Sequence, residues 1–198
     1  MSQQAMVSPA PDQLSPDERE RLLQLARQAL DEAVREGRLS DLDLGDLPPH
    51  LSQDGIAFVT LTVEGHLRGC VGGLEAKLPL AEDVRQHAVA AGLNDFRFPP
   101  VRSEELTHIV IEISRLTSPQ PLDYECPEDL LACLHPGVDG VVLVDGARRV
   151  TFLPQVWEKI PNPSQFLGML CQKMGAPADL WKQKKLTVLI YRVEKFRE

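Results

Sequence analysis

The residues with the greatest chemical potential lie together in one segment, residues 67–73 (LRGCVGG). Arg68 could hold a carboxylate or a phosphate through two parallel hydrogen bonds. Three glycines could let a ligand or another backbone come close, and their amides could cradle an anion. The candidate ligand-binding residues of this segment are therefore Arg68, Gly69, Gly72 and Gly73. We expect the ligand to be a small anion or a protein segment.

Cys70, at the centre of this segment, has two interpretations. It could be the nucleophile of a thiol-dependent transferase or hydrolase if its surroundings favour the thiolate. A hairpin with a two-residue turn at 64–65 would instead pair Cys70 with Val59 and place it beside Leu61. On that apolar face the thiol would be a small buried hydrophobe, which is the interpretation we favour. A longer turn would change the pairing.

The segment 95–100 (DFRFPP) is the second candidate, because acid and base alternate with aromatics in a loop stiffened by two prolines. Asp95 and Arg97 are its candidate ligand-binding residues. The alternative, which we favour, is structural. Phe96 and Phe98 would clamp the loop over the core, and Asp95 and Arg97 would form a solvated pair.

Two further acids have structural and chemical interpretations. Glu112 follows Val110 and precedes Ser114 on one face of an isoleucine-rich strand, where a buried carboxylate needs a partner. A structural ion pair is the expected role, and a catalytic base is the alternative. Asp139, in a glycine-spaced turn, is expected to hydrogen-bond to its own backbone, and Trp157 is expected to pack a helix.

Hydrophobic periodicity predicts the elements that position these residues. A capping box at Ser15 and a glycine at position 37 bound the first helix. The hairpins imply antiparallel pairing without strict βαβ alternation, so the expected class is α+β. The predicted strands are 56–63, 66–72, 109–118, 141–144, 149–153 and 186–193, and the predicted helices are 16–36, 79–92, 127–134, 154–160 and 164–174. Residues 1–13 are expected to be a disordered tail, and residues 14–198 a single domain.

Composition limits the possible functions. The chain has 198 residues and a formal net charge of -8, which argues against a large nucleic-acid footprint. A small anion site at the basic C-terminal end stays open as an alternative. Its residues are Lys182, Lys184, Lys185, Arg192, Lys195 and Arg197.

The sequence shows no stretch of ~20 apolar residues and no secretory signal, so we expect no membrane span and a cytoplasmic location. Four cysteines without a CxxC pair are then expected to be reduced thiols. The scattered histidines lack the spacing of metal ligands, and dinucleotide and phosphate-loop motifs are absent. We therefore predict neither a metal nor a cofactor.

Four segments together resemble the AmmeMemoRadiSam system protein A family, whose domain is named after the Alport, intellectual disability, midface hypoplasia and elliptocytosis region. The resemblance covers about residues 16–196, and the family hallmark LRGCIG corresponds to residues 67–72, with Val71 for isoleucine. The segments are LRGCVGGLEAKLPLAEDV, DFRFPPV with EELTHIVIEIS, GVDGVVLVDG, and TFLPQVWEKIPNPSQFL.

The chain departs from the family pattern at two positions. Gly73 stands where the family usually has a hydroxyl residue, which removes a possible ligand contact. Phe96 stands where the family tends to have proline, which alters the stiffness of the loop more than its chemistry.

The resemblance implies a two-lobed α+β fold, a cytoplasmic setting and an association with a Memo-like protein and a radical SAM enzyme. It brings no reaction, substrate or catalytic residue. We favour a non-redox binding or accessory module over the thiol-dependent enzyme.

Overall fold

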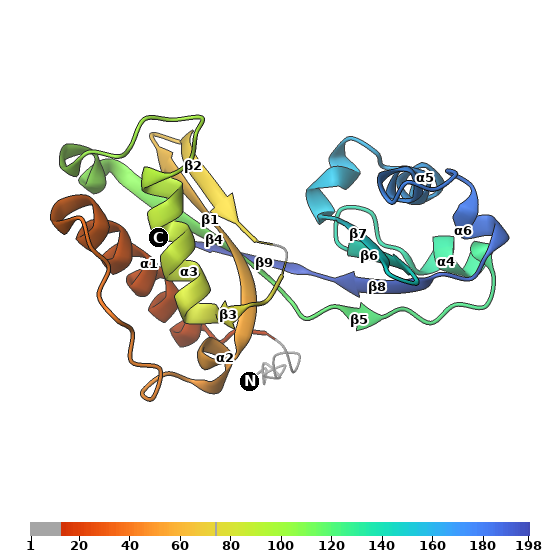
Figure 1. Cartoon of the computed structure of the whole chain (residues 1–198), viewed down its shortest axis with the longest axis horizontal. Coiled ribbons are helices and arrows are strands. Elements are labelled where there is room, and N and C mark those ends of the chain that lie inside the picture. Colours follow the sequence, from red (N-terminus) through yellow and green to blue (C-terminus); the bar gives the residue numbers. More distant parts are fainter. Residues whose placement is uncertain (1–12, 74) are drawn as a thin grey trace, which may run out of the picture. The chain divides into compact units, whose positions relative to one another are not determined.

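The computed structural model describes residues 13–73 and 75–198, which form two compact units (Figure 1). Unit 1 comprises the chain up to Thr117 together with Glu194–Glu198, and unit 2 comprises Ser118–Val193. Unit 2 is therefore inserted between two parts of unit 1. The predicted disordered tail lies outside the described residues, apart from Gln13.

Unit 1 packs two long helices against one face of a sheet (Figure 1). The strand order is β2-β1-β4-β9, and a short strand, β3, pairs with the start of β1. The strands are β1 (Asp54–Val63), β2 (His66–Gly72), β3 (Leu78–Pro79), β4 (Ile109–Leu116) and β9 (Val193–Arg197). The helices are α1 (Pro16–Glu36), α2 (Pro49–Ser52), α3 (Leu80–Leu93) and the 3-10 helix η1 (Ser103–His108).

The sequence explains the ends of α1 and the side of the sheet that it covers. Ser15 and Glu18 form the predicted capping box, and Gly37 ends the helix in the left-handed region at φ 67°. Val59 and Leu61 on β1 alternate with half-buried residues and pack in one core with the apolar face of α1. The opposite face of the sheet, which we call the open face, presents the intervening residues.

Unit 2 has its own core and its own antiparallel sheet, in the order β5-β8-β6-β7. Trp157 stacks on Phe166 at 3.6 Å between ring centroids in that core. The strands are β5 (Gln120–Pro121), β6 (Gly140–Asp145), β7 (Arg148–Phe152) and β8 (Thr187–Tyr191). The helices are α4 (Pro127–Cys133), α5 (Pro163–Lys173), α6 (Leu180–Gln183) and the 3-10 helix η2 (Pro154–Glu158). Helices and antiparallel sheets in both units confirm the α+β class.

The last predicted strand, 186–193, is wrong in one respect. The chain forms β8 in unit 2, breaks at Arg192, and continues as β9 beside β4 in unit 1. One run of alternating residues therefore serves two sheets, and periodicity alone does not mark where a chain leaves one core for another. Among the described residues, no helix is both long and apolar enough to traverse a bilayer.

Candidate functional site

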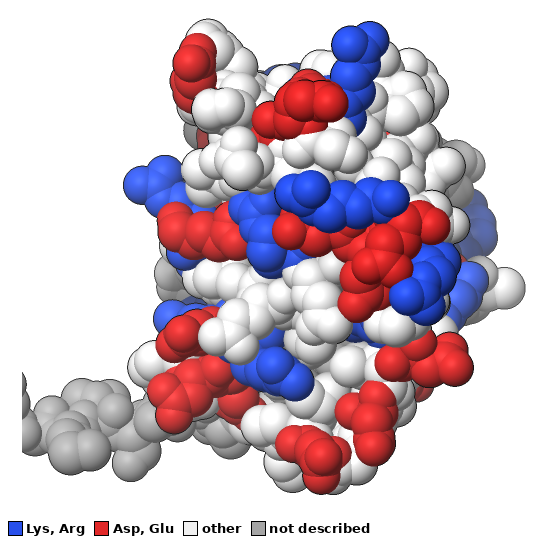
Figure 2. Space-filling view, turned by 90° about the vertical axis from the view of Figure 1, so that its left-hand side faces the viewer, with Lys and Arg blue, Asp and Glu red and all other residues white. Residues whose placement is uncertain are grey.

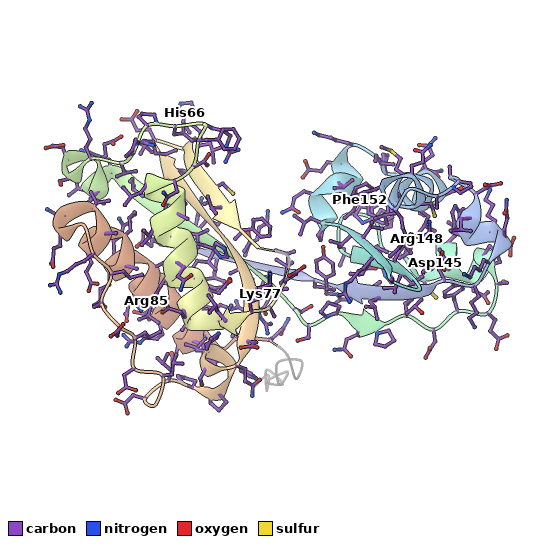
Figure 3. The ribbon with its side chains drawn as sticks, viewed as in Figure 1. His66, Lys77, Arg85, Asp145, Arg148 and Phe152 are labelled. Atoms are coloured by element: carbon purple, nitrogen blue, oxygen red, sulfur yellow. The ribbon has the colours of Figure 1, made fainter. Side chains whose placement is uncertain are left out.

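A β-bulge in β2 decides which way the hallmark segment faces. Val63 pairs with His66, as the two-residue turn predicts, and His66 lies at the turn end of the hairpin (Figure 3). The register then shifts, so that Leu61 pairs with Gly69 and Arg68 is the extra residue. Every residue of β2 beyond Arg68 is thereby moved by one position relative to β1.

Cys70 consequently lies on the open face of the sheet. It pairs with Thr60 and not with Val59, so the predicted burial among apolar side chains is wrong. A register shift of one residue moves a side chain to the other face. Thr60 pairs in turn with Glu112 on β4, and all three residues are half-exposed. Cys70, Thr60 and Glu112 thus form a row across three strands, which we call the open-face row.

The sulfur of Cys70 has polar neighbours. The hydroxyl of Thr60 donates a hydrogen bond to Cys70 Sγ at 3.3 Å. The pKa of Arg97 is raised, chiefly by its hydrogen bond with Asp95 and to a smaller extent by Cys70. Among the described residues, Cys70 forms its hydrogen bonds with Thr60, Asp95 and Arg97, and none of them with a histidine.

Asp95 and Arg97 hold the backbone of Cys70 from the outer side of β2, an edge strand of the sheet. The N–H of Cys70 donates to Asp95 Oδ2 at 2.9 Å, and Arg97 Nη2 donates to the carbonyl of Cys70 at 3.1 Å. Arg97 also pairs with both oxygens of Asp95, at 2.9 Å from Nε and 2.6 Å from Nη2. We call this arrangement the edge clamp. It satisfies two backbone groups that an edge strand otherwise leaves open.

The edge clamp corrects the interpretation of the loop. Phe96 is 96% exposed and does not clamp the loop over the core. Asp95 is the anchored residue instead, with a side chain only 3% exposed, whereas that of Arg97 is 44% exposed. The hydrogen bonds from Arg97 and from the Cys70 amide hold the pKa of Asp95 well below its ordinary value, so its carboxylate stays ionised.

Arg68 is committed to a partner inside unit 1. Its Nε and Nη2 bind the two carboxylate oxygens of Glu105, each at 3.0 Å, and its side chain is 13% exposed. The Arg68 hydrogen bond, together with one from the Arg102 amide, lowers the pKa of Glu105. A pocket of about 540 Å³ borders this pair. Its lining includes two arginines and two glutamates, so its charges balance and it does not select an anion.

Packing accounts for two of the candidate glycines. A Cβ at Gly69 would lie 2.1 Å from the carbonyl oxygen of Ala91 in α3, and a Cβ at Gly72 would lie 2.4 Å from the ring of Phe58. Gly73 differs, because a Cβ there would make only ordinary van der Waals contacts, at 3.6 Å with the ring of His87 and at 3.9 Å with the carbonyl oxygen of Glu75. Of these three candidate glycines, only Gly73 therefore has room for a side chain.

The other predicted sites do not converge. Lys184 pairs with Asp145 near the β6–β7 hairpin, where Asp145 also pairs with Arg148 (Figure 3). Lys182 and Lys185 lie over the rings of aromatic residues, at 5.1 Å and 5.4 Å from their centroids. These three lysines therefore have separate local partners and do not form one anion site.

Asp139 and Trp157 have structural contacts in unit 2. The Asp139 carboxylate accepts the amide of His135 at 2.8 Å, and the Trp157 ring nitrogen donates to the Asp139 carbonyl at 2.7 Å. Around the described residues no group of three or more His, Cys, Asp or Glu side chains has the arrangement of a metal site. Figure 2 shows acidic and basic side chains interspersed on the face of unit 1 that bears α1, without a broad basic region.

The open-face row is the part of the site that the sequence did not reveal. Thr60 looks like any strand residue, and its contact with Cys70 depends on the bulge at Arg68. The pairing of Thr60 with Glu112 depends on the order of β1 and β4 in the sheet. The only available signal was the alternation of Glu112 with Val110 and Ser114.

Comparisons with known proteins agree over nearly the whole chain. The sequence profile of the AMMECR1 family matches residues 23–196. A protein of Methanothermobacter thermautotrophicus is 38% identical over 193 residues, which cover 93% of this chain and 96% of that protein. A protein of Thermofilum pendens is 36% identical over 200 residues, covering 93% and 92%.

A crystal structure shows the same fold. It is that of an uncharacterized protein from Pyrococcus horikoshii, which is 32% identical to this chain and superposes with a TM-score of 0.71 over 93% of both chains. The profile, the archaeal relatives and this structure agree with the resemblance of the hallmark segment. The chain belongs to the AMMECR1 family.

Proposed function

We propose that unit 1 is a binding module that holds an extended protein segment or a small ligand on the open face of its sheet, at Cys70. In this proposal the chain acts as a non-redox accessory of Memo-like and radical SAM proteins. The family association supports those partners. The small anion predicted from Arg68 is less well supported, because Glu105 already binds Nε and Nη2 of that guanidinium and the remaining Nη1 is buried.

The observation that carries the proposal is the fixed position of Cys70. Its amide and its carbonyl are both held by the edge clamp, while its thiol faces the open side of the sheet beside Thr60. Binding sites are preorganised when residues behind the contacting group lock its position. In the edge clamp, a buried carboxylate and a guanidinium both bind the backbone of a single residue, Cys70. Fixing the position of the Cys70 thiol explains this arrangement better than packing of the loop against the strand does.

Blocking the open face tests this proposal. Thr60→Arg would place a long cation in the centre of the open-face row, and Thr107→Arg adds the same side chain at an exposed position of η1. Binding of each full-length variant to the Memo-like and radical SAM proteins of the same organism is measured by isothermal titration calorimetry. We expect Thr60→Arg to weaken binding at least about tenfold, the scale of ~1.4 kcal/mol at an interface centre, and Thr107→Arg to leave it unchanged. Equal affinities for both variants would refute a binding role for this face.

The second candidate is a thiol-dependent transferase or hydrolase with Cys70 as nucleophile. It is favoured by the hydroxyl of Thr60 on the sulfur and by the guanidinium of Arg97 on the carbonyl of the same residue, since cations and hydrogen-bond donors are typical of the surroundings of reactive cysteines. In such a reaction the thiolate attacks an ester or thioester carbonyl, the alcohol or thiol leaves, and water releases the acid from the acyl-cysteine.

An acyl-transfer assay distinguishes the two candidates. With p-nitrophenyl acetate, an enzyme would release a burst of p-nitrophenolate followed by steady turnover, and Cys70→Ser would lose both. A binding module would be acylated at most once per chain and would show no turnover. Replacing the other cysteines, Cys126, Cys133 and Cys171, ensures that any signal belongs to Cys70.

A further inference from the structure

The two edges of the unit 1 sheet differ. The outer edge of β2 is closed at Cys70, where Asp95 and Arg97 of the edge clamp bind the backbone. The strand at the other edge is β9, and among the described residues only β4 pairs with it. An edge strand presents N–H and C=O groups that can pair with a further strand. The outer side of β9 is therefore the edge of this sheet at which another chain can add a strand.

One hydrogen bond shows which backbone groups of β9 point outward. Glu198 donates its N–H to the carbonyl of Ile111 at 3.2 Å, so its backbone faces β4. Backbone groups alternate in direction along a paired strand, so those of Lys195 and Arg197 face away from β4. These two residues carry the groups that an added strand would bind.

A groove of about 550 Å³ lies between α1 and β9. Its helical wall extends from Pro16 to Arg27, which is about 16 Å at the rise of an α-helix and equals the length of about five residues of extended strand. Leu23 and Phe196 line the groove, are half-buried and pack against the core of unit 1. The groove therefore has the length for one extended segment and an apolar surface for one of its side chains.

The charged residues that line this groove carry no excess of either sign. Two arginines of α1 form ion pairs with glutamates at the end of the chain, Arg19 with Glu194 and Arg27 with Glu198. The two remaining charged residues of the lining, Glu20 and Arg197, have opposite signs. A groove with balanced charges and an apolar surface favours an apolar side chain over an ion.

Cations prevail where β9 borders the open face. Lys195 and Arg197 are exposed there and form no ion pair among the described residues. The ion pair of Glu194 with Arg115 aligns β9 with β4 in antiparallel register. Glu112 then lies opposite Arg197 but pairs with neither cation, so the structural ion pair predicted for Glu112 is wrong. Two cations with one acid beside them leave an excess of positive charge at this edge.

The same cations disfavour a second copy of this chain as the added strand. Full overlap of two antiparallel β9 strands would place Lys195 opposite the same residue of the other copy. A shift toward the chain end would place it opposite Arg197. Like charges in directly opposite positions destabilise a strand pair, whereas opposite charges stabilise it. The edge therefore favours a strand that brings acidic side chains.

We infer that the outer edge of β9 binds an extended segment of a partner protein as an added antiparallel strand, with the pattern acidic, apolar, acidic. The two acids lie opposite Lys195 and Arg197, and the apolar residue between them enters the groove beside Leu23 and Phe196. Alternate side chains of a strand point to opposite faces, so one segment meets both requirements. The inference does not depend on the proposed site at Cys70, because β9 is the other edge strand of the sheet.

Peptide binding tests the inference on the full-length chain. The probe is fluorescein-labelled Ser-Thr-Glu-Val-Glu-Thr-Ser, and a comparison peptide has lysine in place of both glutamates. Fluorescence anisotropy measures the dissociation constants. We expect the acidic probe to bind at least about tenfold more tightly than the lysine peptide.

Backbone methylation of the probe tests whether it pairs as a strand. The amides of the two glutamates would face β9, and N-methylation of both should abolish binding. The amide of the valine would face away, and its N-methylation should change the dissociation constant by less than about twofold.

Reversal of the charges on β9 tests where the probe binds. In the double variant Lys195→Glu and Arg197→Glu, the preference should invert, so that the lysine peptide binds more tightly than the acidic probe. The control variant, Arg21→Glu and Arg35→Glu, makes the same change in net charge at exposed positions of α1 outside the groove. It should keep the native preference. Circular dichroism verifies that each variant is folded.

Several outcomes would overturn the inference. The acidic probe fails to bind, binds no better than the lysine peptide, or loses equal affinity through methylation of either kind of amide. An equal effect of the control variant would also place the probe elsewhere. A dimer in analytical ultracentrifugation that dissociates on charge reversal of β9 would assign the edge to a second copy of this chain instead.

Discussion

Cys70 and Cys171 differ in exposure, and this difference predicts their reactivity. Cys70 is half-exposed on the open face, whereas Cys171 is fully buried in unit 2, where burial raises the pKa of its thiol. We expect Ellman's reagent at neutral pH to modify Cys70 in the folded chain and Cys171 only after unfolding. Peptide mapping of the labelled protein identifies each site. Labelling of Cys171 before Cys70 would contradict the exposure that the bulge gives to Cys70.

The depressed pKa of Asp95 predicts how its substitution changes the acid stability. A carboxyl group whose pKa is lower in the folded than in the unfolded chain stabilises the fold fully above its unfolded pKa, whose ordinary value is 3.8. That contribution is lost as the pH falls from the unfolded pKa through the lower pKa of the folded chain. At pH 7, Asp95→Asn should therefore have a lower free energy of unfolding than the native chain. As the pH falls below ~4, the free energy of unfolding should decrease less in Asp95→Asn than in the native chain.

Urea unfolding at several pH values measures this effect. Asp41→Asn, at an exposed position in the segment that follows α1, is the matched control and should parallel the native chain. Hydrogen exchange at the Cys70 amide gives an independent readout, because that amide donates to Asp95. Unchanged protection of this amide in Asp95→Asn would show that the edge clamp does not depend on the charge.

At the scale of elements, the contact of β2 with α3 predicts that alanine at Gly69 lowers the free energy of unfolding much more than alanine at Gly73 does. In Gly69→Ala the new methyl would lie 2.1 Å from a backbone oxygen of α3, so strand and helix must separate. We expect a loss of about 1–3 kcal/mol of unfolding free energy, the usual cost of overpacking. Gly73→Ala meets only ordinary contact at 3.6 Å and should change stability by less than ~1 kcal/mol. Chemical denaturation measures the free energy of unfolding of both variants. Equal losses in the two would contradict the close approach of β2 to the backbone of α3 at Gly69.

The elements themselves were largely predictable, because their signals are local. The capping box at Ser15, the two-residue turn at 64–65 and the alternation of β4 all lie within a few residues of the structure they specify. The bulge at Arg68 has no comparable mark in the sequence, and it reversed the face assigned to Cys70. The bond from Cys70 to Asp95 joins residues 25 apart and required the packing of α3 on β2. The sequence therefore predicted which residues belong to the site, but not the face of the sheet on which each side chain lies.

At the scale of the whole molecule, each unit has a separate hydrophobic core, and both tryptophans of the chain belong to unit 2. Tryptophan fluorescence therefore reports on unit 2, whereas far-UV circular dichroism also follows α1 and α3 of unit 1. We expect Gly69→Ala to lower the dichroism midpoint in urea more than the fluorescence midpoint. Phe166→Ala removes the ring stacked on Trp157 and should lower the free energy of unfolding that fluorescence reports by about 3–5 kcal/mol. Equal shifts of both signals in Gly69→Ala would show that the units unfold as one.

The insertion of unit 2 between β4 and β9 also imposes an order on synthesis. A ribosome releases β1, β2 and β4 first, then all of unit 2, and only then β9. During that interval β4 is an edge strand, and it exposes backbone groups that later belong to the interior of the sheet. Unit 2 has all of its strands in one continuous stretch and can finish folding while unit 1 still waits. The nascent chain thus presents an unpaired strand edge, the kind of surface that chaperones protect from aggregation, until its final strand emerges.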